Sequence, residues 1–303
     1  MGVVMSKSIL DAQALKSEAA AYAWVESRVW PDGPVCPHCG GTERISKMKG
    51  KSTRIGVHKC YQCRKQFTVK VGTIFEDSHV PMHLWLQAIF LMCSSKKGIS
   101  SNQLHRTLGV TLKTAWFMSH RIREAMRSGD VTPMGSHGGH VEADESYIGK
   151  IKGTKPKPGG SHKNMVFALI DRDTRKARTF HVDGKRVADI GPIIRENLSK
   201  DARLITDEGR WYVKVGREFA SHETVDHFNK EYVRYATDPE TGEEYAITTN
   251  TLENYFSVFK RGMKGIYQHC SEKHLHRYLA EFDFRYTTAL GWAWMTCSVQ
   301  SGP

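Results

Sequence analysis

The sequence lacks a long apolar run. No segment approaches the roughly 20 apolar residues that a helix needs to span a bilayer. The first 30 residues also lack the uninterrupted apolar stretch of a signal peptide. We therefore expect a protein without a membrane partner that stays in the cytoplasm.

Cysteine is scarce for a chain of 303 residues. Four of the seven cysteines form two close pairs, and the other three are scattered, at Cys93, Cys270 and Cys297. This arrangement is a poor disulfide framework for a chain of this length, so a reducing compartment fits best.

Acidic residues are also in deficit. Aspartate and glutamate number 32 against 44 lysines and arginines, which gives a net charge of +12. A strongly basic chain favours a polyanionic partner, and nucleic acid is the first candidate. The sequence shows no internal repeat, and its length allows roughly two to three compact units.

Changes in composition divide the chain into four segments. Residues 1–30 are rich in alanine, lysine and glutamate and contain a predicted helix over 7–29. Residues 31–75 combine turns, cysteine pairs and short alternating runs, which indicate small strands in a metal-stapled module. Residues 76–130 return to helical periodicity, with predicted helices over 82–93, 101–108 and 111–126.

The fourth segment, residues 131–303, contains strands and then helices. Strand patterns cover 140–148, 165–171, 177–182 and 203–206, and helical periodicity covers 187–198, 249–260 and 271–290. The stretch from the end of the strand 203–206 to residue 249 is predicted to be irregular. The basic loop Gly149–His162 either clamps DNA or is merely solvated. We expect an α/β fold, more broadly an α+β multidomain chain, in which helices cover a mixed sheet.

The two cysteine pairs form a zinc-binding pattern. Cys36 and Cys39 form one C-x-x-C knuckle, and Cys60 and Cys63 form another after 20 intervening residues. This spacing lets two tight turns present four thiolates tetrahedrally, so we predict a zinc ribbon with a structural Zn²⁺. A redox dithiol is the alternative, although a thioredoxin-like site needs only one pair. His38 lies inside the first knuckle and is expected to be exposed or to support a ligand.

Basic residues gather in the same segment. From Arg44 to Lys70 there are nine lysines or arginines and no acidic residue. Such a surface suits phosphate groups, so we expect the ribbon to contact nucleic acid. A solvated basic face is the alternative.

Residues 99–111 have the pattern of a helix-turn-helix. Leu104 and Leu108 can pack a short helix, Gly109 permits the turn, and Thr111 can cap the next helix. No acidic residue occurs over 96–123, so the second helix can enter a major groove. An ordinary helical hairpin is the alternative. The candidate DNA-binding residues on the second helix are Lys113, Thr114, His120 and Arg121.

Two carboxylates lie on separate predicted strands. Alternation places Glu142 and Asp144 on one face and Glu145 on the other, and an aspartate in mid-strand is costly unless it binds something. Asp207 ends a strand 63 residues after Asp144 and can approach it if the two strands are neighbours. Alternatively, Asp207 is a turn residue before Gly209.

A predicted helix supplies a third acid. Asn250, Glu253, Ser257 and Lys260 have i, i+3, i+7 and i+10 spacing and share one face. Clustered carboxylates are what a phosphoryl-transfer enzyme with two Mg²⁺ ions needs to hold its metals. A capping box formed by Asn250 and Glu253 is the structural alternative.

The ribbon, the helix-turn-helix and the order of the acids together resemble the zinc-ribbon, DDE-type transposases of bacterial insertion sequences. The most specific motifs are Trp30–Gly40, Glu142–Tyr147, Thr206–Glu208, Thr249–Arg261 and the closing stretch His269–Arg285. After Tyr286 the family tends to continue with asparagine and arginine, whereas this chain has threonines. That departure concerns the tail and not the acids.

The resemblance implies a ribonuclease-H-like catalytic domain over 131–303. In that domain Asp144 and Asp207 would bind Mg²⁺, or Mn²⁺ in its place. Glu253 would be the third ligand, with Asn250 as its rival, and Lys260 would contact a phosphate. 

The implied activity is cleavage and strand transfer at the ends of a DNA element. The implied partners are double-stranded DNA and further copies of the chain in a homo-oligomer that pairs two ends, so the cytoplasmic protein would associate with the nucleoid when bound. A non-enzymatic DNA-binding regulator and a nuclease without joining activity are the alternatives.

Overall fold

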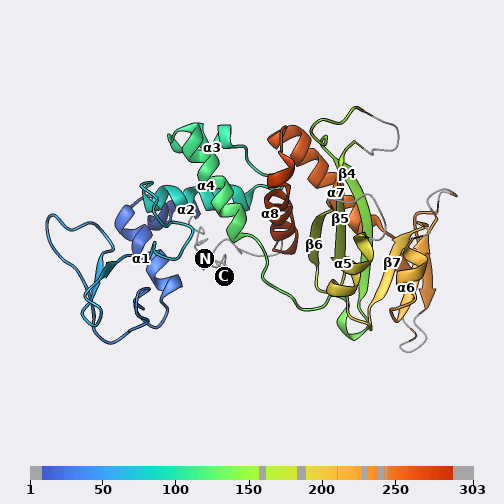
Figure 1. Cartoon of the computed structure of the whole chain (residues 1–303), viewed down its shortest axis with the longest axis horizontal. Coiled ribbons are helices and arrows are strands. Elements are labelled where there is room, and N and C mark those ends of the chain that lie inside the picture. Colours follow the sequence, from blue (N-terminus) through green and yellow to red (C-terminus); the bar gives the residue numbers. More distant parts are fainter. Residues whose placement is uncertain are drawn as a thin grey trace, which may run out of the picture. The chain divides into compact units, whose positions relative to one another are not determined.

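A computed structural model describes residues 9–156, 162–182, 189–209, 211–226, 229, 231–237, 242 and 244–288 (Figure 1). The described chain forms two compact units. The first contains residues 9–95 and 99–126, and the second contains 96–98 and 127–288. Parts of several predicted elements lie outside the described residues, among them the start of the helix 7–29, the centre of the loop 149–162, the start of the helix 187–198 and the end of the helix 271–290.

The first unit opens with a broken helix. Two 3₁₀ turns, η1 (Ile9–Asp11) and η2 (Gln13–Leu15), precede α1 (Glu18–Val29), so the single helix predicted over 7–29 is wrong in its first half. The break falls where Ser17 takes an extended conformation at the start of α1, and serine favours such positions over helix interiors.

A small antiparallel sheet and three helices complete this unit. The sheet has the order β1 (Ile45–Lys47), β2 (His58–Cys60) and β3 (Gln66–Phe67). The helices are α2 (Met82–Ser94), α3 (Ser101–Leu108) and α4 (Leu112–Ala125), which confirms the three helices predicted here. Glu18 of α1 caps α2 by accepting the N–H groups of Met82 at 2.8 Å and His83 at 3.1 Å.

The second unit is built on a five-stranded mixed sheet with the order β6-β5-β4-β7-β8. The antiparallel half contains β4 (His140–Ile148), β5 (Asn164–Asp171) and β6 (Lys176–Val182). On the other side of β4, β7 (Arg203–Asp207) and β8 (Ser221–Val225) run parallel to it. All four predicted strands of this segment are confirmed.

Helices cover both faces of this sheet (Figure 1). The helices α5 (Ile190–Asn197) and α6 (Tyr212–Gly216) pack on one face, and α7 (Asn250–Gly262) and α8 (Leu275–Thr287) pack on the other. Every residue of β5 is buried, and alternate side chains of the strand enter the two cores. This is a ribonuclease-H-like arrangement, as predicted.

Part of the stretch before residue 249 is ordered, so its prediction as irregular is wrong. It contains α6, β8 and a hairpin of β9 (Arg234–Thr237) and β10 (Glu244–Ile247). These elements are short, and β8 and the hairpin are largely half-exposed and polar. Neither helical nor strand periodicity is therefore visible in the sequence.

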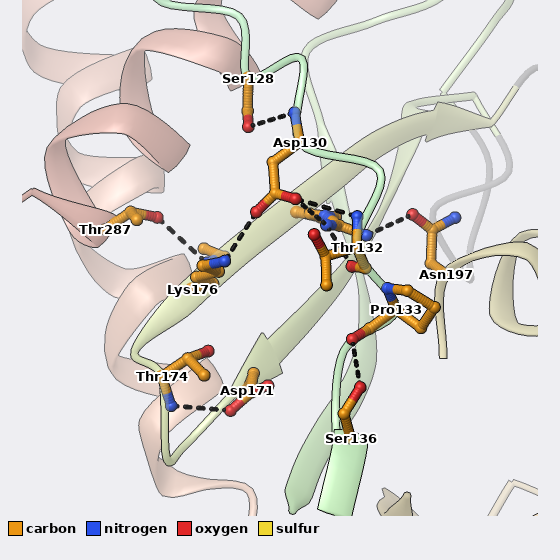
Figure 2. A network of polar contacts seen from close by, with 12 residues as sticks. Ser128, Asp130, Thr132, Pro133, Ser136, Asp171, Thr174, Lys176, Asn197 and Thr287 are labelled. Atoms are coloured by element: carbon orange, nitrogen blue, oxygen red, sulfur yellow. Dashed lines mark hydrogen bonds and ion pairs between the residues drawn. The ribbon is translucent and has the colours of Figure 1, made fainter. Parts of the chain in front are cut away.

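The segment that enters the second unit is tied to the edge of the sheet (Figure 2). The Asp130 carboxylate accepts a hydrogen bond from Lys176 Nζ at 2.7 Å and from the Thr132 N–H at 2.9 Å. The Lys176 ammonium lowers the pKa of Asp130 well below its usual range. Arg178 donates to the Thr132 carbonyl at 2.7 Å and to Asn197 at 3.2 Å. These contacts fix the chain before β4.

Among the described helices, none has the length and apolar character required to cross a membrane.

Candidate functional site

The four paired cysteines converge in the first unit. The Cys36 and Cys63 sulfurs lie 3.6 Å apart, the Cys39 and Cys60 sulfurs lie 3.7 Å apart, and all four lie within 4.8 Å of one another. A tetrahedral Zn²⁺ with Zn–S bonds of about 2.3 Å separates its sulfurs by about 3.8 Å. The cluster therefore fits zinc, as the spacing predicts, and His38 lies outside it with an exposed side chain.

Both cysteine knuckles use the same backbone turn. The residue after the second cysteine takes a left-handed conformation in each, at Gly40 (φ 71°) and at Arg64 (φ 63°). Glycine suits this position, whereas the arginine is held there against its preference. In the second knuckle the N–H groups of Cys63 and Gln62, together with the neighbouring thiols, lower the pKa of Cys60, while the neighbouring thiols raise the pKa of Cys39. The turn thus favours the thiolate that a metal requires.

The residues predicted to contact DNA differ in their placement on α4. Lys113 is exposed, and Thr114 lies in the first turn, where its N–H donates to the capping hydroxyl of Thr111 at 3.2 Å. His120 is only 4% exposed and packs against Trp116, with ring centroids 4.2 Å apart. Arg121 donates to the carbonyls of Ile74 at 2.9 Å and Glu76 at 2.5 Å.

His120 and Arg121 are therefore engaged within the first unit, and their placement does not support the predicted contact with DNA. Sequence reasoning missed three exposed apolar residues of α4, which lie beside Lys113: Leu112, Trp116 and Phe117.

In the second unit the parallel pairing of β4 and β7 sets Asp144 beside Asp207. The ladder pairs Glu142 with Ile205, and both aspartates lie two residues further along their strands. The expectation that these strands are neighbours is confirmed. Asp207 also forms the predicted turn, because its Oδ1 accepts the Gly209 N–H at 3.0 Å.

Electrostatics link these aspartates to Glu253 in the first turn of α7. Burial and then the charge of Glu145 raise the pKa of Asp144 to about 7. The charges of Asp207 and Glu253 add to the rise. The acids from three elements therefore share one region, and their mutual repulsion is what a bound cation would relieve.

A cavity of about 670 Å³ opens at two of these acids. Asp144 and Glu253 form part of its wall, while Asn250 is the exposed first residue of α7. Positive charge in the same cavity comes from basic residues of α7 and the helical turn that follows it, Lys260, Arg261 and Lys264. The last two were missed, although Lys264 lies four residues after Lys260 and Arg261 lies four residues after Ser257, which helical spacing would have shown.

The start of α7 is capped from the sheet. The helix begins after Thr249, and the buried Glu142 carboxylate accepts the Leu252 N–H at 2.8 Å. Arg172 Nε donates to the same carboxylate at 2.6 Å, and its two terminal nitrogens donate to the carbonyls of Ala246 and Thr248. The alternative of a capping box between Asn250 and Glu253 is therefore wrong.

Glu145 is a further acid at the cavity, which strand alternation alone assigns to the other face. Its Oε1 accepts the Trp211 indole N–H at 3.2 Å, yet it also borders the cavity of Asp144. Burial raises its pKa, partly offset by the Tyr212 hydroxyl.

Comparison with known protein families places this chain among the transposases of the DDE type. Residues 137–287 match the model of the ISXO2-like transposase domain, and residues 16–66 match that of the transposase zinc-ribbon domain. The chain belongs to this transposase family, and the predicted resemblance is confirmed.

Similar proteins include a relative from a transposable element and a chain of a solved structure. An uncharacterized protein in transposable element ISH50 of Halobacterium salinarum is 24% identical over 271 residues, covering 84% of this chain and 86% of that protein. A chain in the cryoEM structure of the simian T-cell lymphotropic virus intasome with PP2A regulatory subunit B56 gamma is 12% identical. It aligns with a TM-score of 0.27 over 59% of this chain and 63% of that chain.

Proposed function

We propose that this protein binds the ends of an insertion sequence and catalyses metal-dependent cleavage of the DNA and its transfer to a target. One observation carries the proposal: Asp144 of β4 and Glu253 of α7 line a cavity with a basic wall, and the charge of Asp207 on β7 acts on Asp144. Acids of this kind hold metals, and basic side chains hold phosphates.

The acids fit Mg²⁺ or Mn²⁺ by their chemistry. Asp144, Asp207 and Glu253 offer oxygen ligands, and the raised pKa of Asp144 marks an excess of negative charge. When bound, the metals would activate the attacking oxygen and stabilise the leaving oxygen of the phosphodiester. Asn250, which is exposed at the start of α7, remains the rival for the third position.

The chain's other residues bind and orient the strand. Lys260, Arg261 and Lys264 would hold the phosphates on either side of the bond that is cut. Glu142 and Arg172 would hold the first turn of α7 in a fixed position against the sheet, and this would direct Glu253 toward the two aspartates. The acids position metals and do not attack the DNA, so no covalent protein intermediate forms.

The zinc ribbon would serve binding and not chemistry. Four thiolates fill a tetrahedral Zn²⁺ and leave no open position for a water or a substrate. The ribbon and the helix-turn-helix, with Lys113 and Thr114, are proposed to contact the element end. Joining two ends calls for at least two copies of the chain in the active complex.

The test compares wild type with Asp144→Asn on a DNA that carries the element ends. We expect the variant to bind this DNA with unchanged affinity and to lose both cleavage and strand transfer in Mg²⁺. An active variant would refute the assignment. Binding without any Mg²⁺-dependent product in the wild type would favour the regulator, and cleavage without joined products would favour the nuclease.

A further inference from the structure

The ladder between β4 and β7 ends just before the two aspartates. Its last pair is Glu142 with Ile205, so the pairing of these two strands stops short of both carboxylates. Asp207 is paired instead with Val225 of β8, on the other side of its strand. The distance between Asp144 and Asp207 therefore depends on contacts that are made beyond the ladder.

Glu145 and Trp211 make such a contact. Glu145 follows Asp144 in β4, and its Oε1 accepts the indole N–H of Trp211 at 3.2 Å. Trp211 stands directly before α6, in the segment that follows Asp207. Burial raises the pKa of Glu145 and the charge of Asp207 adds to the rise, so these two carboxylates are near neighbours. The hydrogen bond thus links the strand of Asp144 to the segment after Asp207.

Gly209 extends this link to the carboxylate of Asp207. Its N–H donates to Asp207 Oδ1 at 3.0 Å, and its carbonyl accepts the N–H of Tyr212 at 2.9 Å. A Cβ on Gly209 would lie 2.8 Å from the Trp211 ring and 2.9 Å from the Asp207 carboxylate oxygen. The indole and the carboxylate therefore both rest against Gly209, and a residue without a side chain is needed for them to come this close.

We propose that Glu145 is a positioning residue, which acts through Trp211 to fix the orientation of the Asp207 carboxylate for metal binding. The proposal rests on the function proposed above. Residues that orient a metal ligand without touching the metal commonly change metal affinity by about 10- to 100-fold. Glu145 also borders the cavity of Asp144, so direct binding of the metal by Glu145 is the competing role. The test separates the two roles.

The test measures the binding of Mn²⁺ to the full-length, zinc-loaded protein without DNA. Electron paramagnetic resonance follows free Mn²⁺ during a titration at fixed pH and ionic strength. Binding by Asp144→Asn defines the Mn²⁺ that does not belong to the acids, and it is subtracted. Thermal melts of every variant show that the protein compared in each titration is folded.

Two variants of Glu145 separate its hydrogen bond from its charge. Glu145→Gln and Glu145→Ala both remove the charge, but only the glutamine keeps an oxygen that accepts the Trp211 N–H. We therefore expect Glu145→Ala to bind Mn²⁺ about 10-fold more weakly than Glu145→Gln. Trp211→Phe keeps a ring and loses the N–H, so it should weaken binding by a similar factor alone and should add nothing to Glu145→Ala.

Two further variants test the path and its specificity. Gly209→Ala should also weaken Mn²⁺ binding, because the added methyl group would push the indole and the Asp207 carboxylate apart. The matched control is Trp116→Phe in α4, where the side chain is 43% exposed against 42% for Trp211. This control should leave the affinity for Mn²⁺ unchanged.

Three outcomes would overturn the proposal and leave the proposed function standing. Equal affinities of Glu145→Gln and Glu145→Ala would show that the hydrogen bond does not matter. A large loss in Glu145→Gln with an unaffected Trp211→Phe would show that Glu145 is itself a metal ligand. Additive losses in the double variant would show that the two residues act separately. Failure of the proposed function is seen differently, as a wild type that binds no more Mn²⁺ than Asp144→Asn.

Discussion

The carboxylate of Glu142 in the centre of the sheet accepts the backbone N–H of Leu252, 110 positions later in the chain, at 2.8 Å. The side chain of Glu142 is fully buried, and its second oxygen receives Arg172 at 2.6 Å. This pair therefore fixes where α7 begins and, through α7, where Glu253 lies.

Removing the buried carboxylate of Glu142 should lower the stability of the second unit. We expect Glu142→Ala to destabilise the second unit by about 3–5 kcal/mol, because it leaves the Arg172 charge and a helix N–H without their acceptor. Urea unfolding measures the change. The matched control is Glu218→Ala, which breaks an exposed pair with Arg195 and should have a much smaller effect. Similar losses in the two variants would contradict the role of Glu142.

Asp283 of α8 should make the stability of the second unit depend on pH. It accepts the Tyr255 hydroxyl at 2.6 Å and the Thr179 N–H at 2.9 Å, and burial raises its pKa to about 7. The unfolded value is about 3.9. The folded state therefore holds the proton more tightly, so the stabilisation is complete below pH 3.9 and is lost as the pH rises through about 7.

The expected slope from this one group is at most about 1.4 kcal/mol per pH unit. Asp283→Asn cannot titrate, so its unfolding free energy should change less between pH 4 and pH 7 than that of the wild type, whatever its absolute stability. Denaturant melts at several pH values provide the comparison. Parallel pH curves for the two proteins would show that Asp283 titrates normally.

Gly262 marks the close approach of α7 to α8. A Cβ at this position would lie 2.5 Å from the Phe282 ring and 2.7 Å from the Lys97 carbonyl. Gly262→Ala should therefore destabilise the unit by about 1–3 kcal/mol, seen as a lower midpoint in urea. Gly265→Ala is the control, since nothing lies within 4 Å of its added methyl group. An unchanged midpoint for Gly262→Ala would show that the helices separate at little cost.

Local patterns in the sequence predicted the metal cluster and the main elements well. The spacing of Cys36 to Cys63 specifies the knuckles, and alternation around Asp144 specifies its strand, because both depend on neighbours in the chain. The cap of α7 was wrong for the opposite reason. Glu142 and Leu252 meet only through the order of strands in the sheet, which no local period reveals. The burial of His120 likewise depends on packing that charge alone does not predict.

Zinc should be needed for the ribbon and not for the second unit. Cys36→Ser, or a strong chelator, should release the metal and disrupt the cluster in which Trp30 packs against His58 and Phe67. Metal analysis and tryptophan fluorescence report these changes. Cys93→Ser should keep one zinc per chain, because Cys93 lies outside the cluster. A zinc content that Cys36→Ser leaves unchanged would contradict the four-thiolate site.

Two basic residues of α4 should respond differently to truncation. Lys113 is exposed at the start of the helix, so Lys113→Ala should weaken DNA binding and lower the salt slope of the affinity by about 1, as loss of one phosphate contact does. Arg121 holds the carbonyls of Ile74 and Glu76, so Arg121→Ala should mainly lower the melting temperature of the first unit. Anisotropy titrations at several salt concentrations, with thermal melts of each variant, separate the two effects. A salt slope reduced by Arg121→Ala at unchanged stability would restore that residue to the DNA interface.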